Sequence, residues 1–231
     1  MPTAGDHIVT AFDEDMNRLR GLISEMGGRA EAAINGAMSA LVSHDLEGAA
    51  KIVGDDAAID KLEAEVEKLA VQIIGLRAPV ADDLREVVAA LKIASVVERI
   101  GDYAKNIARR ISSLDGANKF EAVSVLNAMG EIVSEMVHEV LDAFAARSAE
   151  EAIAVNERDK SVDDFYNSIF RMLVTFMMEN PQAISSGAHL MFIAKNLERI
   201  GDHATNVAEM VYYAAKGETM PERERGESVA A

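Results

Sequence analysis

Hydrophobic residues recur at steps of three and four along almost the whole chain, the spacing that places them on one face of an α-helix. Alternation with a period of two, which marks strands, is absent from the sequence. Six helical stretches follow one another, at about residues 6–42, 46–76, 81–114, 120–147, 149–179 and 181–215. The pattern therefore predicts an all-α protein of six long helices.

The breaks between these stretches are short. Pro79 and Pro181 are the two internal prolines, and each can begin a helix after a short turn. A further break, rich in Gly and Asn, lies at residues 115–119 and divides the six stretches into two sets of three. Short connections make consecutive helices antiparallel neighbours, so we expect two three-helix bundles.

Two similar sequences occur at equivalent places in the two sets. "VERIGDYAKN" at 97–106 and "LERIGDHATN" at 197–206 are related by a shift of 100, and "DDAAID" at 55–60 falls near "RDKSVD" at 158–163. This internal repeat predicts tandem, pseudo-symmetric bundles. The expected organisation is 1–115 for the first bundle, 116–216 for the second and 217–231 for a disordered C-terminal tail.

The charge and composition exclude several classes of protein. Acidic residues number 39 against 23 basic ones, with no basic stripe, so nucleic acid is not an expected partner. Cysteine is absent, which removes thiolate chemistry and leaves oxygen and a few histidines as metal ligands. Without a signal peptide or an apolar run of membrane-spanning length, we expect a cytoplasmic protein that meets a membrane only through its partners.

In each repeat, this sequence places acidic side chains in a row along one face of the third helix. Residues four apart lie on one helix face, which groups Glu98, Asp102 and Asn106 in the first repeat. Two carboxylates at this spacing repel each other unless a cation compensates them. Apolar residues occupy both sides of the helix, so the row is expected to face a neighbouring helix or a covered groove. A glycine inside the row, Gly101, favours close approach of that neighbour.

The second repeat carries the same arrangement in Glu198, Asp202 and Asn206, with a glycine at 201. Further acids lie on the preceding helix of each repeat, and they are spaced four apart: Asp56 and Asp60, then Asp159 and Asp163. Antiparallel packing could bring each pair toward the row of its own repeat. Carboxylates from facing helices, completed by Asn carbonyls, suit a divalent metal or a cluster of hard cations.

Other sequence signals are weaker. "EMVH" at 135–138 matches the Glu-x-x-His element of di-iron bundles, but such sites need two copies and further glutamates. His203 points about 100° away from Asp202 on the helix and is at best a ligand at the rim. Phosphate loops, nucleophile elbows and Ser/His/Asp arrangements are absent, so the sequence offers no catalytic residues.

Three segments together resemble the PhoU family of phosphate-specific transport accessory proteins. They are "FDEDMNRL" with "MGG" on the first helix, "LRAPVADDLREVVAALKIASVVERIGDYAKNIARR" across the second turn and third helix, and "LERIGDHATNVAE" in the second half. The similarity extends from about residue 6 to 215. The second half departs from the first at "ENPQAISSG", so the two acidic sites need not be equivalent.

The resemblance implies two three-helix bundles, often dimeric, whose acidic motifs bind iron, manganese, zinc or magnesium in sites that can be multinuclear. It implies a regulatory adaptor and not an enzyme. Such an adaptor joins the ATPase subunit of the phosphate ABC transporter to a phosphate-sensing histidine kinase, and it restrains the phosphate-starvation response and phosphate uptake. Two alternatives stay open from the residues: a carboxylate-bridged di-metal oxidase and a metal-free helical scaffold.

Overall fold

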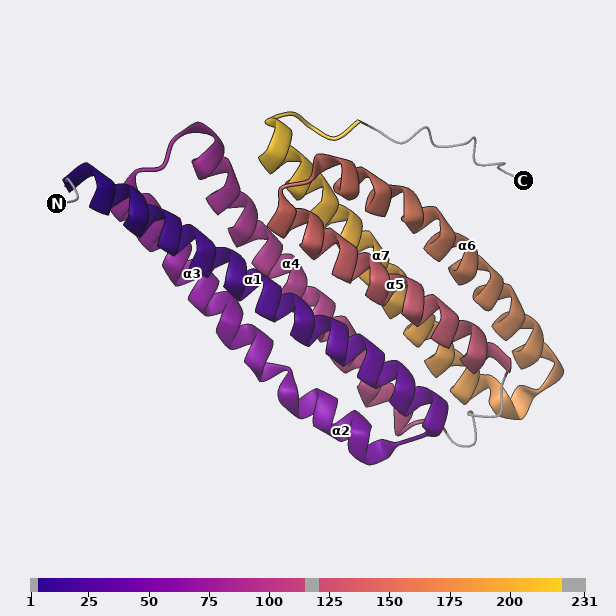
Figure 1. Cartoon of the computed structure of the whole chain (residues 1–231). Helices are drawn as coiled ribbons and strands as arrows, with labels where there is room; N and C mark the ends of the chain where they lie inside the picture. Colours follow the sequence, from indigo (N-terminus) through magenta and orange to yellow (C-terminus); the bar gives the residue numbers. More distant parts are fainter. Residues whose placement is uncertain (1–3, 115–120, 222–231) are drawn as a thin grey trace.

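A computed structural model describes residues 4–114 and 121–221, with side chains from residue 11 onward. Within these ranges every regular element is helical, which confirms the predicted all-α class (Figure 1). The elements are α1 (Ala4–Ser43), α2 (Leu46–Asp55), α3 (Ala57–Arg77), α4 (Ala81–Ile111), α5 (Glu121–Ala146), α6 (Ala149–Glu179), the 3₁₀ turn η2 (Pro181–Ala183) and α7 (Ile184–Lys216).

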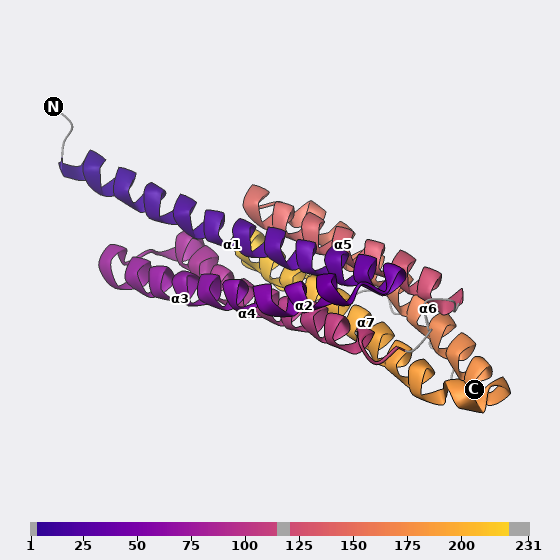
Figure 2. The ribbon, with the colours of Figure 1, turned by 90° about the horizontal axis from the view of Figure 1, so that it is seen from below.

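The helices form two bundles that lie side by side. The first contains α1, α4 and the pair α2 and α3, and the second contains α5, α6 and α7 (Figure 1). The bundles meet along two helix pairs, α1 with α5 and α4 with α7, so the third helices of both repeats lie against each other at the centre (Figure 2). This arrangement gives α4 and α7 neighbours on two sides, as their apolar faces require.

The second predicted stretch is divided at Asp56, where the sequence analysis expects one continuous helix. Asp56 keeps helical dihedral angles, φ −54° and ψ −40°, and its carbonyl accepts a tight-turn hydrogen bond of 2.9 Å from the Ile59 amide. Gly54 just precedes this point, and glycine and aspartate are poor helix formers. In the second repeat Glu157 stands in place of Gly54, and α6 is unbroken.

The turn between the first and second helices is built the same way in both repeats. His44 and Arg147 both have a φ of 54° and end α1 and α5. The next residue caps the following helix: the Asp45 carboxylate accepts hydrogen bonds from the amides of residues 47 and 48, and the Ser148 hydroxyl accepts one from the amide of residue 151. Both pairs are related by a shift of 103, as residues 55–60 and 158–163 are, which supports an internal duplication.

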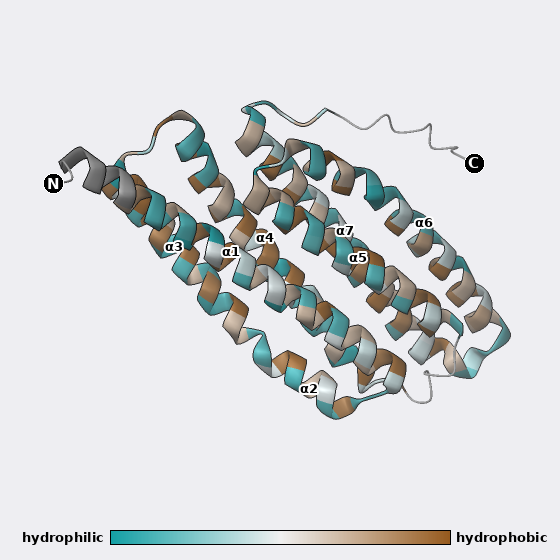
Figure 3. Cartoon of the chain, in the orientation of Figure 1, coloured by the Kyte–Doolittle hydropathy of each residue, from teal (hydrophilic) through white to brown (hydrophobic). Residues whose placement is uncertain are grey.

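One apolar core runs through both bundles. Large side chains such as Ile23, Ile73, Ile100, Leu126 and Ile200 are each no more than 1% exposed and belong to a single cluster. Polar residues occupy the outer helix faces, and hydrophobic ones turn toward the neighbouring helices (Figure 3). The two repeats therefore share their core across the α1–α5 and α4–α7 contacts.

Three regions bear on the predicted boundaries. The break at residues 115–119 lies outside the described residues, as do residues 222–231 of the predicted tail. Gly217, with φ 73°, ends α7, and Met220 beyond it is only 7% exposed, so residues 217–221 are folded against the bundle. None of the helices in residues 4–114 and 121–221 combines the length and hydropathy that crossing a bilayer requires.

Candidate functional site

The first acidic cluster lies where α4 passes the start of α3. Glu98 and Asp102 project from α4 toward Asp56, and the ammonium group of Lys105 donates hydrogen bonds to the carboxylates of both aspartates. A Cβ on Gly101 would come within 2.7 Å of Ile59 Cδ1 and 3.8 Å of Asp56 Oδ1. The glycine therefore lets α4 and α3 approach closely beside the carboxylates, as the sequence predicts.

Crowding of negative charge in this cluster changes the acidity of Glu98. Burial raises the pKa of its carboxyl group most, and the charge of Asp102 raises it further. Glu63, Asp60 and Asp56 add smaller effects in the same direction. Glu63 is a member that the sequence analysis did not identify, although residues 56, 60 and 63 share one face of α3 by their spacing of four and three.

The second cluster occupies the equivalent place between α6 and α7. A Cβ on Gly201 would lie 3.1 Å from Val162 Cγ1 and 3.2 Å from Asp159 Oδ1, so Asp159 stands directly beside the α7 row. The pKa of Asp202 is raised to about 6, mostly by burial and then by the charge of Glu198 and of Asp159. Although the Asp202 side chain reaches solvent on one side, the neighbouring charges still favour its protonated form.

The two clusters are not equivalent in their basic residues. Lys105 serves the first, whereas its counterpart Thr205 is buried and donates a 2.7 Å hydrogen bond to the Asp202 carbonyl. Lys195 serves the second by pairing with Glu198, and its counterpart in the first repeat is Ser95. Each cluster thus contains one ammonium group that partly neutralises it.

The remaining predicted ligands lie at the edges of the clusters. Asp60 and Asp163 are exposed, and Asn106 is half-buried. Asn206 is exposed and lies near His203, with Nδ2 3.5 Å from Nδ1, on the side of α7 that faces α4. The structure therefore gathers the carboxylates more closely than the asparagines.

The donor set is compatible with a hard cation, but it is not a preformed coordination sphere. Within the described residues, no three His, Asp or Glu side chains converge in a geometry that would hold a metal ion. In the first cluster the Lys105 ammonium stands between two of the carboxylates that would coordinate it. A bound cation would therefore have to displace this lysine. Burial, and then the charges of Asp102 and its neighbours, still raise the pKa of Glu98.

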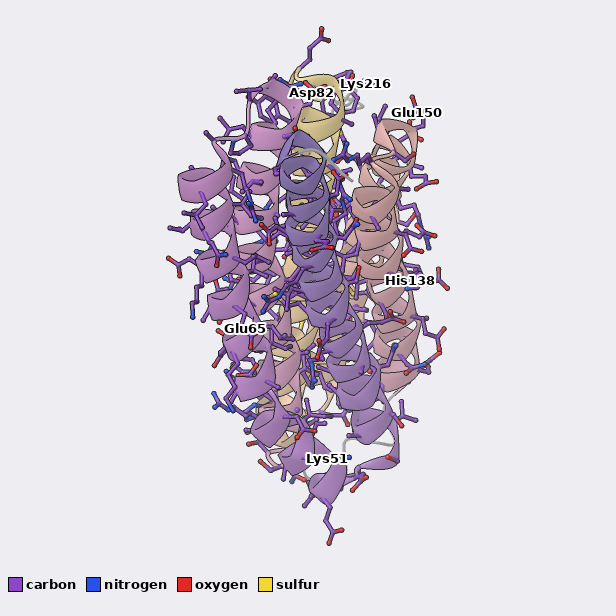
Figure 4. The ribbon with its side chains drawn as sticks, turned by 60° about the vertical axis from the view of Figure 1, so that its left-hand side comes forward. Lys51, Glu65, Asp82, His138, Glu150 and Lys216 are labelled. Atoms are coloured by element: carbon purple, nitrogen blue, oxygen red, sulfur yellow. The ribbon has the colours of Figure 1, made fainter. Side chains whose placement is uncertain are left out.

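The weaker sequence signals lie elsewhere. Glu135 pairs with Arg158 at 2.6 Å, and His138 lies 3.1 Å from Glu31. His138 lies on an exposed part of α5 at the edge of its contact with α1 (Figure 4). His203 turns from the acidic row toward α4, where burial, then Arg99 and Arg199, lower the pKa of its imidazole. Neither histidine joins a carboxylate cluster of the third helices.

This geometry defines a class of protein. It is a duplicated helical bundle with a carboxylate cluster between the second and third helices of each half. The family model described as "PhoU domain" matches residues 23–111 and 126–211. The chain belongs to the PhoU family. This membership confirms the resemblance noted in the sequence and the prediction that the chain is not an enzyme.

Individual relatives match nearly the full chain. The phosphate-specific transport system accessory protein PhoU homolog of Zymomonas mobilis is 56% identical over 225 residues, which is 97% of this chain and 95% of that protein. The crystal structure of PhoU from Pseudomonas aeruginosa has a TM-score of 0.85 and 37% identity, covering 90% of this chain and 100% of that one. The phosphate transport system regulatory protein PhoU from Streptococcus pneumoniae also has a TM-score of 0.85, with 27% identity, over 91% of this chain and 100% of its own.

Proposed function

We propose that this protein is a cytoplasmic regulatory adaptor of phosphate transport. In this role it joins the ATPase subunit of a phosphate ABC transporter to a phosphate-sensing histidine kinase and restrains the starvation response and uptake when phosphate is plentiful. The observation that carries the proposal is the 56% identity to a phosphate-specific transport system accessory protein over 97% of the chain. At that identity and coverage, the two proteins share their fold over nearly their whole length.

Exposed apolar side chains supply candidate contact surfaces for such partners. In the first repeat they gather around the turn between α3 and α4, where Leu76 is 71% exposed and Val80 74%. In the second repeat they lie at the corresponding turn, where Met178 is 79% exposed and Ile184 52%. Clusters of exposed apolar side chains on otherwise polar helix faces are typical of protein contact sites.

Purification of the tagged chain from cells grown with high and with low phosphate tests the adaptor role. We expect the transporter ATPase and the kinase to co-purify with the wild-type protein under high phosphate. Val80→Glu should reduce that recovery, whereas Val42→Glu, at a site that is 47% exposed on α1, serves as a matched control. If neither the transporter ATPase nor the kinase is recovered at high or at low phosphate, the adaptor role is contradicted.

We further propose that the two acidic clusters bind iron, manganese, zinc or magnesium. In the first cluster Glu98, Asp102 and Asp56 would supply the ligands, supported by Glu63 and Asp60. In the second, Glu198, Asp202, Asp159 and Asp163 would do so, and Asn106 and Asn206 could complete the shells. Burial raises the pKa of Glu98 and Asp202 most, and the charges of neighbouring carboxylates raise it further. A cation would stabilise the charged carboxylates against both effects.

Neutral isosteres test the metal sites. Glu98→Gln with Asp102→Asn should lower Mn²⁺ affinity at the first cluster by at least about tenfold, because two anionic oxygen ligands become neutral amides. The matched control is Glu25→Gln with Asp13→Asn, which removes the same charge from exposed positions of α1. Titration calorimetry and elemental analysis give the readout. Equal Mn²⁺ binding by both variants and the wild type would contradict a site at the first cluster, and a wild type that binds no Mn²⁺ would favour the metal-free scaffold.

A further inference from the structure

Contacts between α3 and α4 fix which parts of these antiparallel helices lie opposite each other. Lys105 of α4 pairs with Asp56 at the start of α3, and a Cβ on Gly101 would meet Ile59. From these contacts toward the α3–α4 turn, each step forward on α3 corresponds to one step back on α4. The last two turns of α3 therefore lie beside the first two turns of α4, and the two helices form a seam on the protein surface.

Apolar side chains are exposed on both sides of this seam near the turn. Val71 is 60% exposed, and the other three are between 36% and 37% exposed: Ile74, Leu84 and Val88. The end of the first bundle that carries them projects beyond the second bundle (Figure 2). These four residues form the apolar end of the seam, and exposed apolar clusters of this kind mark protein contact sites.

Carboxylates occupy the same seam farther from the turn. Steps of three and four residues stay on one helix face, and such steps connect the apolar and acidic positions of both helices. The positions are 56, 60, 63, 67, 71 and 74 on α3, and 84, 88, 91, 95, 98 and 102 on α4. Five carboxylates gather there, since after burial four of them raise the pKa of the fifth, Glu98: Asp102, Glu63, Asp60 and Asp56. These five side chains form the acidic end of the seam.

The second repeat carries the same order of surface properties on the seam between α6 and α7. Phe170, which is 43% exposed, and Ile184, which is 52% exposed, lie toward the turn. The carboxylates of Asp159 and Glu198 lie farther along, beside Asp202. Individual residues differ at equivalent positions of the two repeats, so what the repeats share is the order of an apolar end and an acidic end.

We propose that the α3–α4 seam binds an amphipathic helix of a partner protein, with apolar side chains at one end and Lys or Arg at the other. The apolar anchors of such a helix fit between the exposed apolar side chains, as in other helix-in-groove contacts. Its cations meet the acidic end, which stays negatively charged although Lys105 pairs with two of the five carboxylates. Asp60 and Ile74 of α3 lie about 21 Å apart along the helix axis, so the cations and the anchors need a similar separation.

A partner of opposite charge fits this surface better than a second copy of the chain. The chain has a net charge of −16, so a second copy brings more carboxylates than cations to the acidic end. The proposal rests on the adaptor role, because it states the chemistry that a partner of the adaptor presents to the first repeat.

Two synthetic peptides of the same composition test the proposal with the full-length chain in EDTA, which keeps metal ions away from the carboxylates. Both are helices of about 18 residues, which span about 27 Å. In the probe peptide, Leu anchors occupy one half and Lys the other, whereas in the control peptide Leu and Lys alternate along the whole helix. The probe should bind at least about tenfold more tightly, because only the probe matches both ends of the seam. Fluorescence anisotropy of the labelled peptides gives the affinities.

Substitutions at the apolar end show where the probe peptide binds. Val71→Ser with Val88→Ser should weaken its binding at least about tenfold, because two exposed valines lose their apolar contact with the anchors. The matched control, Val42→Ser with Leu46→Ser, replaces side chains that are 47% and 48% exposed near the α1–α2 turn and should bind like the wild type. All four positions are exposed, so circular dichroism of both variants should match the wild type.

Four outcomes overturn the proposal. They are equal affinities for the two peptides, equal weakening in both double variants, a wild-type chain that binds neither peptide, and a wild-type dimer that Val71→Ser with Val88→Ser abolishes in sedimentation velocity. The last outcome would mean that a second copy covers the apolar end. None of these measurements uses the transporter or the kinase, so the proposal and the adaptor role fail independently. Recovery of the partners without peptide binding would put the docking surface elsewhere on the adaptor.

Discussion

Asp202 makes the stability of the folded chain depend on pH. Its pKa is raised to about 6 from an ordinary value of 3.8, so the folded state binds a proton more tightly than the unfolded state. The resulting stabilisation is complete below about pH 3.8 and is lost as pH rises through about 6. Between pH 5 and 7 in EDTA, the free energy of unfolding of the wild type should therefore fall with rising pH more steeply than that of Asp202→Asn.

Urea unfolding at several pH values measures this difference. Asp164→Asn, at an exposed position of the same cluster's α6 helix, is the control and should keep the wild-type pH dependence. The result that contradicts the prediction is an Asp202→Asn variant whose pH dependence between 5 and 7 equals that of the wild type. Addition of Mn²⁺ at pH 7 should also stabilise the wild type more than Asp202→Asn, if the second cluster holds the cation.

At the scale of single residues, the sequence predicts the carboxylates that face another helix but not their basic neighbours. Glu98 and Asp102 follow from the repeat and the helical spacing alone. Lys105 and Lys195 could not be assigned in the same way, because a lysine side chain is long and its ammonium group reaches partners on either side of the helix. The lysines also occupy unmatched positions in the two repeats, so the repeat itself gives no signal for them.

At the scale of helices, Gly201 and Gly28 have opposite surroundings. Alanine in a helix interior is favoured over glycine by roughly 0.5–1 kcal/mol. A Cβ on Gly28 meets no atom within 4 Å, so Gly28→Ala should stabilise the protein by about that amount. On Gly201 a Cβ would lie 3.1 Å from Val162 Cγ1 and 3.2 Å from Asp159 Oδ1, so these two side chains would have to shift by a few tenths of an ångström.

Gly201→Ala should therefore be no more stable than the wild type, and at least about 1 kcal/mol less stable than Gly28→Ala. Urea denaturation of the two variants measures the difference. Equal stabilisation by both substitutions would show that the helices do not need the glycine for their approach. The comparison separates the effect of helix propensity, which both variants share, from the effect of packing, which only one of them has.

The break between α2 and α3 shows what hydrophobic periodicity cannot predict. Hydrophobic periodicity locates all six stretches, but it continues across Gly54 and Asp56, where α2 gives way to α3. The interruption depends on local helix propensity, which periodicity does not measure. In α6 the equivalent position of the glycine is Glu157, a better helix former, and the helix continues without a break through Asp159.

At the scale of the whole molecule, the sequence predicts two bundles but not how they meet. Apolar faces of α1, α4, α5 and α7 all carry the same periodicity, and nothing in that pattern distinguishes contacts within a repeat from contacts between repeats. A polar contact between the repeats specifies part of how the two bundles meet. Glu86 of α4 is 4% exposed, and its carboxylate accepts hydrogen bonds from Arg20 of α1 and from Arg147 at the start of the α5–α6 turn.

Glu86 therefore ties the two repeats together, and its loss should destabilise the whole protein. Glu86→Ala removes a buried carboxylate from Arg20, which is 25% exposed, and from Arg147, which is 48% exposed. Because both guanidinium groups keep some contact with water, this should lower the free energy of unfolding by about 2 kcal/mol. Glu25→Ala is the matched control, because it breaks a 2.9 Å glutamate–arginine pair with Arg29 whose side chains are half exposed. That control should cost less than about 1 kcal/mol, since exposed ion pairs contribute little. Similar losses for the two variants in urea denaturation would mean that apolar packing alone joins the repeats.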